Sequence, residues 1–236
     1  MLSPILEMIQ ADLEPLDGKD ILVLCSAGGE VPFWLAERMA EGHILGIELD
    51  DDLLKTAWRL ADEKCLGGKS PGQRVEFRKA EKKRIPLESN TFDGLISEFI
   101  MFPTSTPTEI GQLEMARVLR PGGVMVITDI IITRPVTPEE RKELAAIGLD
   151  YLCEGTKDDF HSWMQEAGLT GIEVKDLTRL VEVIWKERQN HDPAVEHQAG
   201  YSLLLGDTQA VQKTGGSLGK SLFYIYVRGT KVSRAG

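Results

Sequence analysis

Apolar runs alternate with segments of helical periodicity over the first 132 residues of the chain. The runs DILVLCS, HILGIEL and VMVITDIII show no polar alternation, and such runs are typical of strands buried on both faces. Two further strands are predicted at RVEFRKA and FDGLISEF. Apolar residues at helical spacing predict helices at 3–13, 31–41, 51–66 and 109–119. The repeated order of strand, helix and strand predicts a parallel sheet with helices on both faces.

The pattern changes after residue 132. Helices are expected at 138–152 and 157–168, and strands at 171–177 and 221–229. Between these two strands lies a mostly helical insertion, residues 178 to about 220. Its aromatic residues and glycine-rich end favour a lid over a substrate pocket, and a homodimer contact is the alternative that the sequence leaves open. With 236 residues, the chain is expected to form one α/β domain.

The net charge and the cysteine content limit the kinds of partner that the protein is expected to bind. The chain has 27 Lys and Arg against 37 Asp and Glu, a formal net charge of −10 that would repel nucleic acid and anionic lipid. The N-terminal stretch lacks the basic region of a signal peptide, and VMVITDIII is too short to span a bilayer. The cysteines, Cys25, Cys65 and Cys153, have no metal-ligand spacing. We therefore expect a soluble, cytoplasmic protein without a bound metal, and with neither nucleic acid nor membrane as a partner.

The turn CSAGGE, residues 25–30, follows the first strand, where open α/β sheets hold their cofactors. Gly28 and Gly29 allow the backbone to approach a ligand closely, and free N–H groups at the next helix favour an anionic group. Glu48 ends the second strand, 20 residues past Gly28, where a carboxylate can accept hydrogen bonds from ribose hydroxyls. A nicotinamide dinucleotide and S-adenosylmethionine both fit this description.

Other motifs separate the two cofactors. A dinucleotide fold uses G-x-G-x-x-G, and CSAGGE lacks the first and third glycines. Three segments resemble, in order and spacing, the post-I, II and III motifs of class I S-adenosylmethionine-dependent methyltransferases, of the type 11-like small-molecule group. They are GIELDDDLLKTA, AEKKRIPLESNTFDGLIS and EMARVLRPGGVMVITDI. The resemblance covers roughly residues 18–132. It implies a Rossmann-like, doubly wound, seven-stranded and mainly parallel sheet with an antiparallel last strand.

The same resemblance implies residues for cofactor binding. Glu48 matches the ribose-binding acid, and Glu81, five residues before Pro86, matches the acid near the adenine amino group. The family's D-x-G-x-G-x-G loop appears here as VLCSAGG, with Gly29 the best-matched glycine. The full cofactor-binding set is Cys25, Ala27, Gly28, Gly29, Glu48, Leu49, Ala80, Glu81 and Lys82.

The resemblance further implies methyl transfer to a small-molecule acceptor. The leaving thioether is neutral, so the protein mainly aligns and desolvates the reacting atoms, and a general base is optional. Glu98 and Asp129, which end the fourth and fifth strands, are the candidate catalytic residues. A helix cap for Glu98 and a backbone hydrogen bond for Asp129 are their structural alternatives.

Alternatives to this function remain. A nicotinamide-dependent oxidoreductase and a non-catalytic module that binds S-adenosylmethionine are the competing classes. The region around Cys153 is also similar to arsenite methyltransferases, which hold a soft metalloid with cysteine thiolates. However, the cysteine expected shortly after the first motif is absent, because GGEVPFWLA contains none. Cys25 is more simply a small apolar filler beneath the cofactor.

Overall fold

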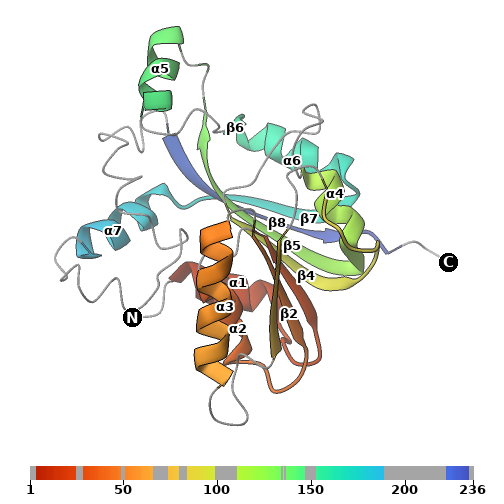
Figure 1. Ribbon diagram of the computed structural model, residues 1–236. Coiled ribbons are helices and arrows are strands. Elements are labelled where there is room, and N and C mark those ends of the chain that lie inside the picture. Colours follow the sequence, from red (N-terminus) through yellow and green to blue (C-terminus); the bar gives the residue numbers. More distant parts are fainter. Residues whose placement is uncertain are drawn as a thin grey trace.

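A single twisted sheet forms the centre of the computed structural model (Figure 1). The structure describes residues 4–24, 29–48, 51–65, 74–79, 84–98, 111–133, 135, 137–146, 153–188 and 222–233. Strand order is β3-β2-β1-β4-β5-β8-β7, and β6 pairs with the last residues of β5. The strands are β1 (Asp20–Leu24), β2 (His43–Glu48), β3 (Val75–Lys79), β4 (Phe92–Glu98), β5 (Leu119–Ile132), β6 (Cys153–Glu154), β7 (Leu169–Asp176) and β8 (Leu222–Lys231).

Strand directions confirm the predicted fold class. Strands β1 to β5 run parallel to their neighbours in this group, and β8 runs antiparallel to both β5 and β7. The mainly parallel sheet with an antiparallel last strand is therefore as expected. The two-residue β6 is additional, because so short a segment carries no periodic pattern that a sequence could reveal.

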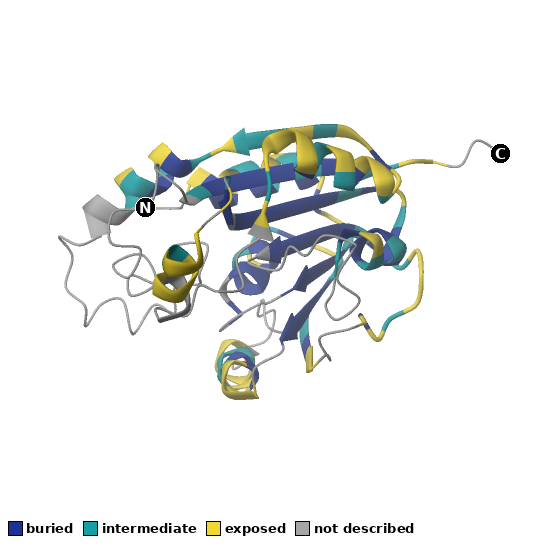
Figure 2. Ribbon diagram, turned by 90° about the horizontal axis from the view of Figure 1, so that it is seen from above, coloured by how far each residue is buried: buried dark blue, intermediate teal, exposed yellow. Residues whose placement is uncertain are grey.

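Helices cover both faces of the sheet, as a doubly wound fold requires. We call the face covered by α1, α2 and α7 the first face, and the face covered by α4 and α6 the second face. Figure 2 shows buried strands between helices whose outer sides are exposed. The helices are α1 (Pro4–Leu13), α2 (Glu30–Ala36), α3 (Asp51–Cys65), α4 (Gln112–Val118), α5 (Pro138–Ala146), α6 (Lys157–Glu166) and α7 (Thr178–Arg188).

Side chains alternate between the two faces along each strand. In β5, Val126 packs on the first face, whereas Met125 and Ile127 pack on the second. Both clusters consist of aliphatic and aromatic residues that are almost fully buried. This two-sided burial explains why β1, β2 and β5 could be recognised as continuous apolar runs.

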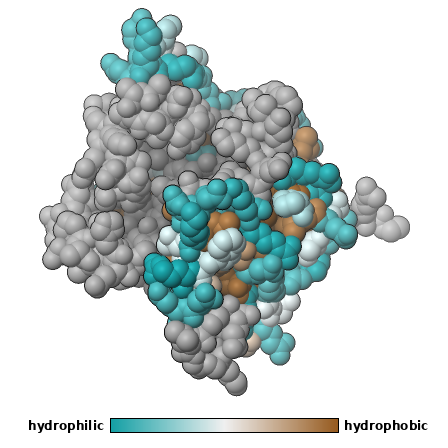
Figure 3. All heavy atoms as spheres, in the orientation of Figure 1, coloured by the Kyte–Doolittle hydropathy of each residue, from teal (hydrophilic) through white to brown (hydrophobic). Residues whose placement is uncertain are grey.

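Helix α3 covers the outer strands β2 and β3. Leu54 and Ala57 pack against Phe33 and Phe77 in a third, smaller cluster. Trp58 Nε1 donates a hydrogen bond of 3.1 Å to the backbone carbonyl of Phe77, in the strand at the margin of the sheet. The described part of this side of the molecule is mainly hydrophilic, with smaller hydrophobic areas (Figure 3). The indole thus covers part of a strand margin that would otherwise offer free backbone groups.

Several helix bounds differ from the sequence-based expectation. α2 ends at Ala36 rather than at residue 41, because Arg38 N–H bonds to the carbonyl of Leu35 in a tighter turn. α4 begins at Gln112, three residues later than expected. Of the insertion at 178–220, the structure describes α7, and residues 189–221 lie outside the described residues.

An ion-pair cluster joins three strands at their amino ends. Arg120 Nη1 lies 2.6 Å from Asp93 and Nη2 lies 2.9 Å from Asp20. Asp93 also accepts a hydrogen bond from the backbone N–H of Asp20. Burial alone would raise the pKa of Asp93, but this N–H and the Arg120 guanidinium outweigh it and hold the pKa below its ordinary value.

We expect Asp93→Asn to lower the unfolding free energy at pH 7 by about 1–2 kcal/mol, since it removes a charge-assisted contact to Arg120. A carboxylate with a lowered folded-state pKa stabilises the protein above its unfolded pKa and loses that effect as the pH falls through the folded value. Urea unfolding between pH 7 and pH 3 should therefore show a weaker pH dependence for the variant. Glu63→Gln, which breaks the exposed Arg59–Glu63 pair, is the control and should change stability by less than about 0.5 kcal/mol.

Candidate functional site

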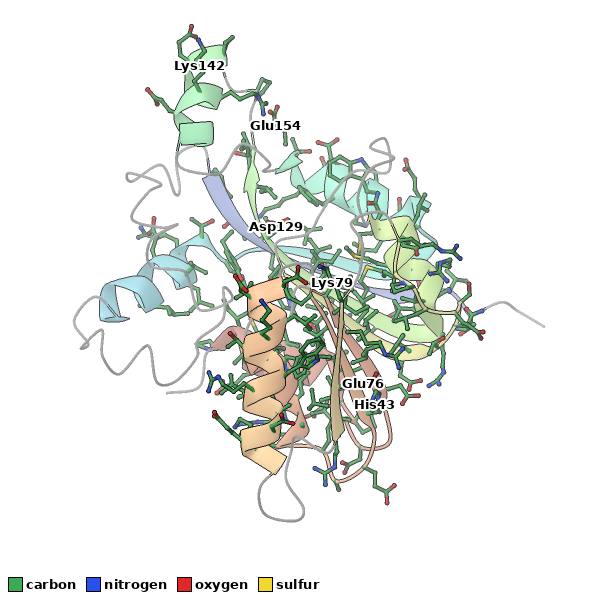
Figure 4. The ribbon with its side chains drawn as sticks, viewed as in Figure 1. His43, Glu76, Lys79, Asp129, Lys142 and Glu154 are labelled. Atoms are coloured by element: carbon green, nitrogen blue, oxygen red, sulfur yellow. The ribbon has the colours of Figure 1, made fainter. Side chains whose placement is uncertain are left out.

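Strands β1 to β5 all finish at one end of the sheet, which we call its carboxyl end. Leu24 of β1 lies opposite both Ile47 and Ser97. Glu48 lies opposite Lys79, and Glu98 lies opposite Thr128. In Figure 4, Lys79 and Asp129 appear toward this end, and His43 and Glu76 toward the other. The structure thus brings Glu48, Glu98 and Asp129 to the same end of the sheet, where α/β folds bind ligands.

Buried polar side chains concentrate there. Among the described residues, the buried polar or charged side chains are Glu48, Ser97, Gln112, Thr128, Asp129 and Thr178. Four of these six lie near the carboxyl ends of strands. Glu48 is the last residue of β2, Ser97 is the next-to-last residue of β4, and Thr128 and Asp129 lie near the end of β5. These polar side chains thus gather at the end of the sheet where open α/β folds bind ligands.

Ser97, Thr128 and Gln112 are not among the residues predicted from the sequence. Ser97 and Thr128 each interrupt an apolar strand one residue before a predicted catalytic acid. That interruption was a usable signal, because a polar residue inside a strand buried on both faces needs a specific partner. Gln112 had no such signal, since it reads as an ordinary polar residue at a helix start.

Gly29 fixes the turn between β1 and α2. Its φ of 91° is in the left-handed region, and it is the N-cap residue of α2. A Cβ atom there would lie 2.7 Å from the Phe77 ring and 2.8 Å from the Phe33 ring. Glycine is therefore required both by conformation and by space. The other predicted residues of this turn, Cys25, Ala27 and Gly28, lie outside the described residues.

Glu48 is the last residue of β2, and its side chain is only 3% exposed. Its register partner is Lys79, whose ammonium group lies 2.5 Å from Asp51 at the start of α3. The segment 80–83, which carries the predicted adenine acid Glu81, continues directly from Lys79. Glu48 thus ends the strand next to β3, the strand that precedes Glu81 in the sequence. Leu49, Ala80, Glu81 and Lys82 lie outside the described residues.

Two residues of α4 fasten the chain immediately after this segment. Glu114 accepts a 2.9 Å hydrogen bond from the Ile85 N–H, and Arg117 donates to the carbonyls of Ile85 and Leu87 at 3.0 and 2.8 Å. The two side chains also pair with each other through two contacts of 2.7 Å. Burial opposes ionisation, yet the pair with Arg117 and the Ile85 N–H keep the pKa of Glu114 below its ordinary value. Ile85 is thereby fixed four residues beyond Glu81, the predicted adenine acid.

Arg117→Lys should weaken the binding of S-adenosylhomocysteine about 3- to 10-fold, because an ammonium group cannot reproduce the planar fork that holds both carbonyls. The unfolding free energy should fall by about 1–3 kcal/mol, since carbonyl partners are lost. Calorimetric titration and urea unfolding measure the two effects. Arg59→Lys, in the exposed pair with Glu63 on α3, provides the matched control. If the Arg117 and Arg59 variants bound S-adenosylhomocysteine with equal affinity, the Glu114–Arg117 pair would have no role in cofactor binding.

The structure describes the side chain of only one of the two candidate catalytic acids. Asp129 is 4% exposed and lies opposite Ile225 of β8. Its neighbour along the strand, Thr128, is fully buried, and its hydroxyl has no hydrogen-bond partner. For Glu98, the backbone is described as the last residue of β4, and the side chain lies outside the described part. Glu98 ends β4 as predicted, whereas β5 continues past Asp129 to Ile132, because Ile130–Ile132 pair with β8.

Two of the cysteines lie at opposite ends of the sheet. Cys153 begins β6 and lies opposite Ile131, beyond the carboxyl end. Cys65 is the last residue of α3, which starts near the carboxyl end and extends about 22 Å away from it, at 1.5 Å per residue. The backbones of Cys65 and Cys153 therefore lie far apart along the direction of the strands. Within the described ranges, no group of three or more His, Cys, Asp or Glu residues could hold a metal ion.

No helix in the described part of the chain is long and apolar enough to cross a membrane.

The chain is similar in sequence to methyltransferases. A family model described as a methyltransferase domain matches residues 22–127. An arsenite methyltransferase of Halobacterium salinarum is 24% identical over 168 residues, covering 71% of this chain and 41% of that protein. A demethylmenaquinone methyltransferase of Clavibacter sepedonicus is 26% identical over 184 residues, covering 70% and 71%. The chain thus spans about two fifths of the length of the arsenite methyltransferase.

Solved structures share the fold. Phosphoethanolamine N-methyltransferase 2 of Haemonchus contortus, in complex with S-adenosyl-L-methionine, superposes with a TM-score of 0.74 at 16% identity, covering 97% of this chain and 52% of that chain. A geranyl diphosphate methyltransferase in complex with the same cofactor gives a TM-score of 0.69 at 19% identity, covering 98% and 85%. At these identities the likeness shows a common architecture.

Proposed function

We propose that this chain is a class I S-adenosylmethionine-dependent methyltransferase, with the methyltransferase domain at residues 22–127, and that it transfers a methyl group from S-adenosylmethionine to a small organic molecule. The observation that carries the proposal is the buried carboxylate of Glu48 at the end of β2. A buried acid at this position offers the acceptor oxygens that a cofactor ribose needs. Gly29, whose turn leaves no room for a Cβ atom, supports it.

Different residues of the proposed site would bind different parts of the cofactor. Glu48 would accept hydrogen bonds from the ribose hydroxyls, and Glu81 from the adenine amino group. The turn that ends at Gly29 would hold the methionyl part, because its backbone can approach closely. S-adenosylmethionine supplies a methyl group activated by its sulfonium. The remaining proposed contacts come from Cys25, Ala27, Gly28, Leu49, Ala80 and Lys82.

The acceptor would lie at the ends of β4 and β5. Its lone pair would form the new bond to the methyl carbon as the carbon–sulfur bond breaks, and the electrons of that bond would remain on a neutral thioether. If the attacking atom carries a proton, Asp129 or Glu98 would take it. Alignment and exclusion of water supply most of the rate, since no charge develops on the leaving group.

An organic acceptor is favoured over a metalloid. Thiolates are the ligands that soft metalloids prefer. The wide separation of the backbones of Cys65 and Cys153 disfavours a site in which all three cysteines bind one ion. We therefore propose a carbon, oxygen or nitrogen acceptor, although one relative acts as an arsenite methyltransferase.

The proposal extends to organisation and partners. We propose one domain over residues 1–236, in the cytoplasm, with the segment 178–220 covering the acceptor or forming a homodimer contact. Its first part, α7, packs through Val181 onto the first face of the sheet. The net charge of −10 supports partners other than nucleic acid or anionic membranes.

Calorimetric titration with S-adenosylmethionine, S-adenosylhomocysteine and NAD, each separately, tests the proposed function. We expect dissociation constants in the micromolar range for the first two and no binding of NAD. Binding of NAD alone would indicate a nicotinamide-dependent oxidoreductase. Binding of none would indicate a non-catalytic interaction module. Binding of S-adenosylmethionine with no methylated product from a broad panel of acceptors would indicate a module that binds the cofactor without catalysis.

A further inference from the structure

An ion pair joins the end of β3 to the start of α3. The ammonium group of Lys79, the last residue of β3, lies 2.5 Å from a carboxylate oxygen of Asp51, the first residue of α3. The two residues are 28 positions apart in the sequence. The pair therefore holds together two elements that are separate in the chain, unlike an ion pair within one helix.

The pair lies on the same face of the sheet as the proposed cofactor residues. Lys79 is the register partner of Glu48 in the parallel pair of β2 and β3, so the two side chains project from one face. Phe77, two residues before Lys79, projects from this face too, and its ring lies against the turn at Gly29, 2.7 Å from the position of a Cβ atom there. The turn at Gly29, the buried Glu48 and the ion pair of Lys79 with Asp51 therefore share one side of the outer strands.

The pair also stands beside the two acids proposed for the cofactor. Asp51 lies three residues after Glu48, the proposed ribose acid, and Lys79 lies two residues before Glu81, the proposed adenine acid. Contact between Lys79 and Asp51 limits how far the chain after β2 can move away from the chain after β3. In the proposed function, adenosine must reach both acids at once, because it carries the ribose and the adenine ring.

The exposure of the pair indicates where its effect should be seen. The side chains of Lys79 and Asp51 are 52% and 62% exposed, and ion pairs as exposed as this contribute little to the stability of a fold. A contact that keeps a site in its binding geometry can still raise affinity, because the ligand then binds without the cost of ordering the site. The expected effect is therefore on ligand binding.

We propose that Lys79 and Asp51 are positioning residues for the cofactor. Their ion pair holds Glu48 and Glu81 at the separation that the adenosine part of S-adenosylmethionine requires. This inference rests on the proposed function. The two residues act through the acids beside them, and neither needs to touch the cofactor.

Calorimetry with S-adenosylhomocysteine on Lys79→Met, Asp51→Asn and the double variant tests this role. Each single substitution should raise the dissociation constant about 3- to 5-fold, and the double variant should raise it no further than the weaker-binding single variant. The two substitutions change the local charge in opposite directions, so an effect of charge alone would have opposite signs in the two variants. Opposite signs, unchanged affinities, or two effects that multiply in the double variant would overturn the proposal.

Asp52→Asn and Lys55→Met are the matched controls. Asp52 shares the first turn of α3 with Asp51, and it pairs with Lys55 at 2.8 Å within the same helix. These substitutions remove the same charges from the same region and leave the contact between β3 and α3 in place. Both should keep the dissociation constant within about a factor of two of the wild type, as should Lys79→Arg, which retains the positive charge. Equal losses in the controls would overturn the proposal, since the effect would then belong to the start of α3.

Salt and a smaller ligand provide readouts that a general loss of packing would not change. Salt screens exposed charges, so the difference between the wild type and Lys79→Met should fall below about 2-fold in about 1 M NaCl. The ligand 5′-methylthioadenosine contains adenosine and lacks the amino-acid part, and Lys79→Met should bind it about 3- to 5-fold more weakly than the wild type does. A difference that persists in high salt, or a loss for S-adenosylhomocysteine alone, would overturn the proposal.

The two levels of inference fail separately. If the wild type binds neither S-adenosylhomocysteine nor 5′-methylthioadenosine, the proposed function fails and the positioning role fails with it. If the wild type binds both ligands and the Lys79 and Asp51 variants bind them equally well, the proposed function stands and only the positioning role is overturned.

Discussion

Gly29→Ala should lower the unfolding free energy by about 2–5 kcal/mol and weaken the binding of S-adenosylhomocysteine at least about 100-fold. Two separate effects add. A non-glycine residue at φ of 91° costs about 1–2 kcal/mol. The new methyl group would also lie within 2.8 Å of the Phe33 and Phe77 rings, which must move and take the turn with them. The turn that cradles the cofactor would no longer keep its shape.

Gly18→Ala is a close control for this experiment. Gly18 also has a left-handed backbone, with φ of 77°, but no atom lies within 4 Å of the position of its Cβ. The Gly18→Ala variant should therefore lose about 1–2 kcal/mol of unfolding free energy, from the backbone conformation alone, and keep its affinity for S-adenosylhomocysteine. Urea unfolding and calorimetry on both variants separate the two effects. If the two variants had equal stability and equal affinity, the close contacts around Gly29 would be irrelevant to the site.

Glu48→Ala should raise the dissociation constant for S-adenosylhomocysteine about 5- to 150-fold, equivalent to about 1–3 kcal/mol. The reason is the loss of charge-assisted hydrogen bonds to the two ribose hydroxyls. Calorimetry with the normal ligand and with its 2′-deoxy analogue identifies the contact. The wild type should prefer the normal ligand, and Glu48→Ala should bind the two about equally.

Glu76→Gln is the control for this second experiment. Glu76 lies toward the opposite end of the sheet, where it pairs with Arg78 (Figure 4). Its replacement should leave both dissociation constants unchanged within about a factor of two. If Glu48→Ala kept the preference of the wild type for the 2′-hydroxyl, Glu48 would have a structural role and the ribose would be bound elsewhere.

The sequence was most informative where burial is two-sided. β1, β2 and the main part of β5 were predicted within about two residues, because strands covered by helices on both faces must be continuously apolar. It was least informative where tertiary contacts decide. α2 stops early through a local turn at Arg38, which no periodicity predicts. β6 exists only because Cys153 and Glu154 meet the end of β5.

The candidate site shows the same division. Glu48, Glu98 and Asp129 lie at one end of the sheet because each is at or near the end of a parallel strand. Their order in the sequence was therefore enough to predict that they share this end. The importance of Gly29 was expected from its motif, and the structure adds the physical reason, two aromatic rings that leave no space for a side chain. The Glu114–Arg117 pair acts across the fold on Ile85 and Leu87, and contacts of this kind have no periodic signature in a sequence.

Strand order has a further consequence for how such an enzyme can change over time. Of the residues proposed for the cofactor, Glu48 ends β2 and the others come after β1, β2 or β3 in the sequence, and these three strands form one half of the sheet. Glu98 and Asp129, proposed for the acceptor, belong to β4 and β5, farther across the sheet. Substitutions that reshape the acceptor half can accumulate with little effect on the cofactor half. An evolving lineage could therefore exchange one substrate for another while its methyl donor stays the same.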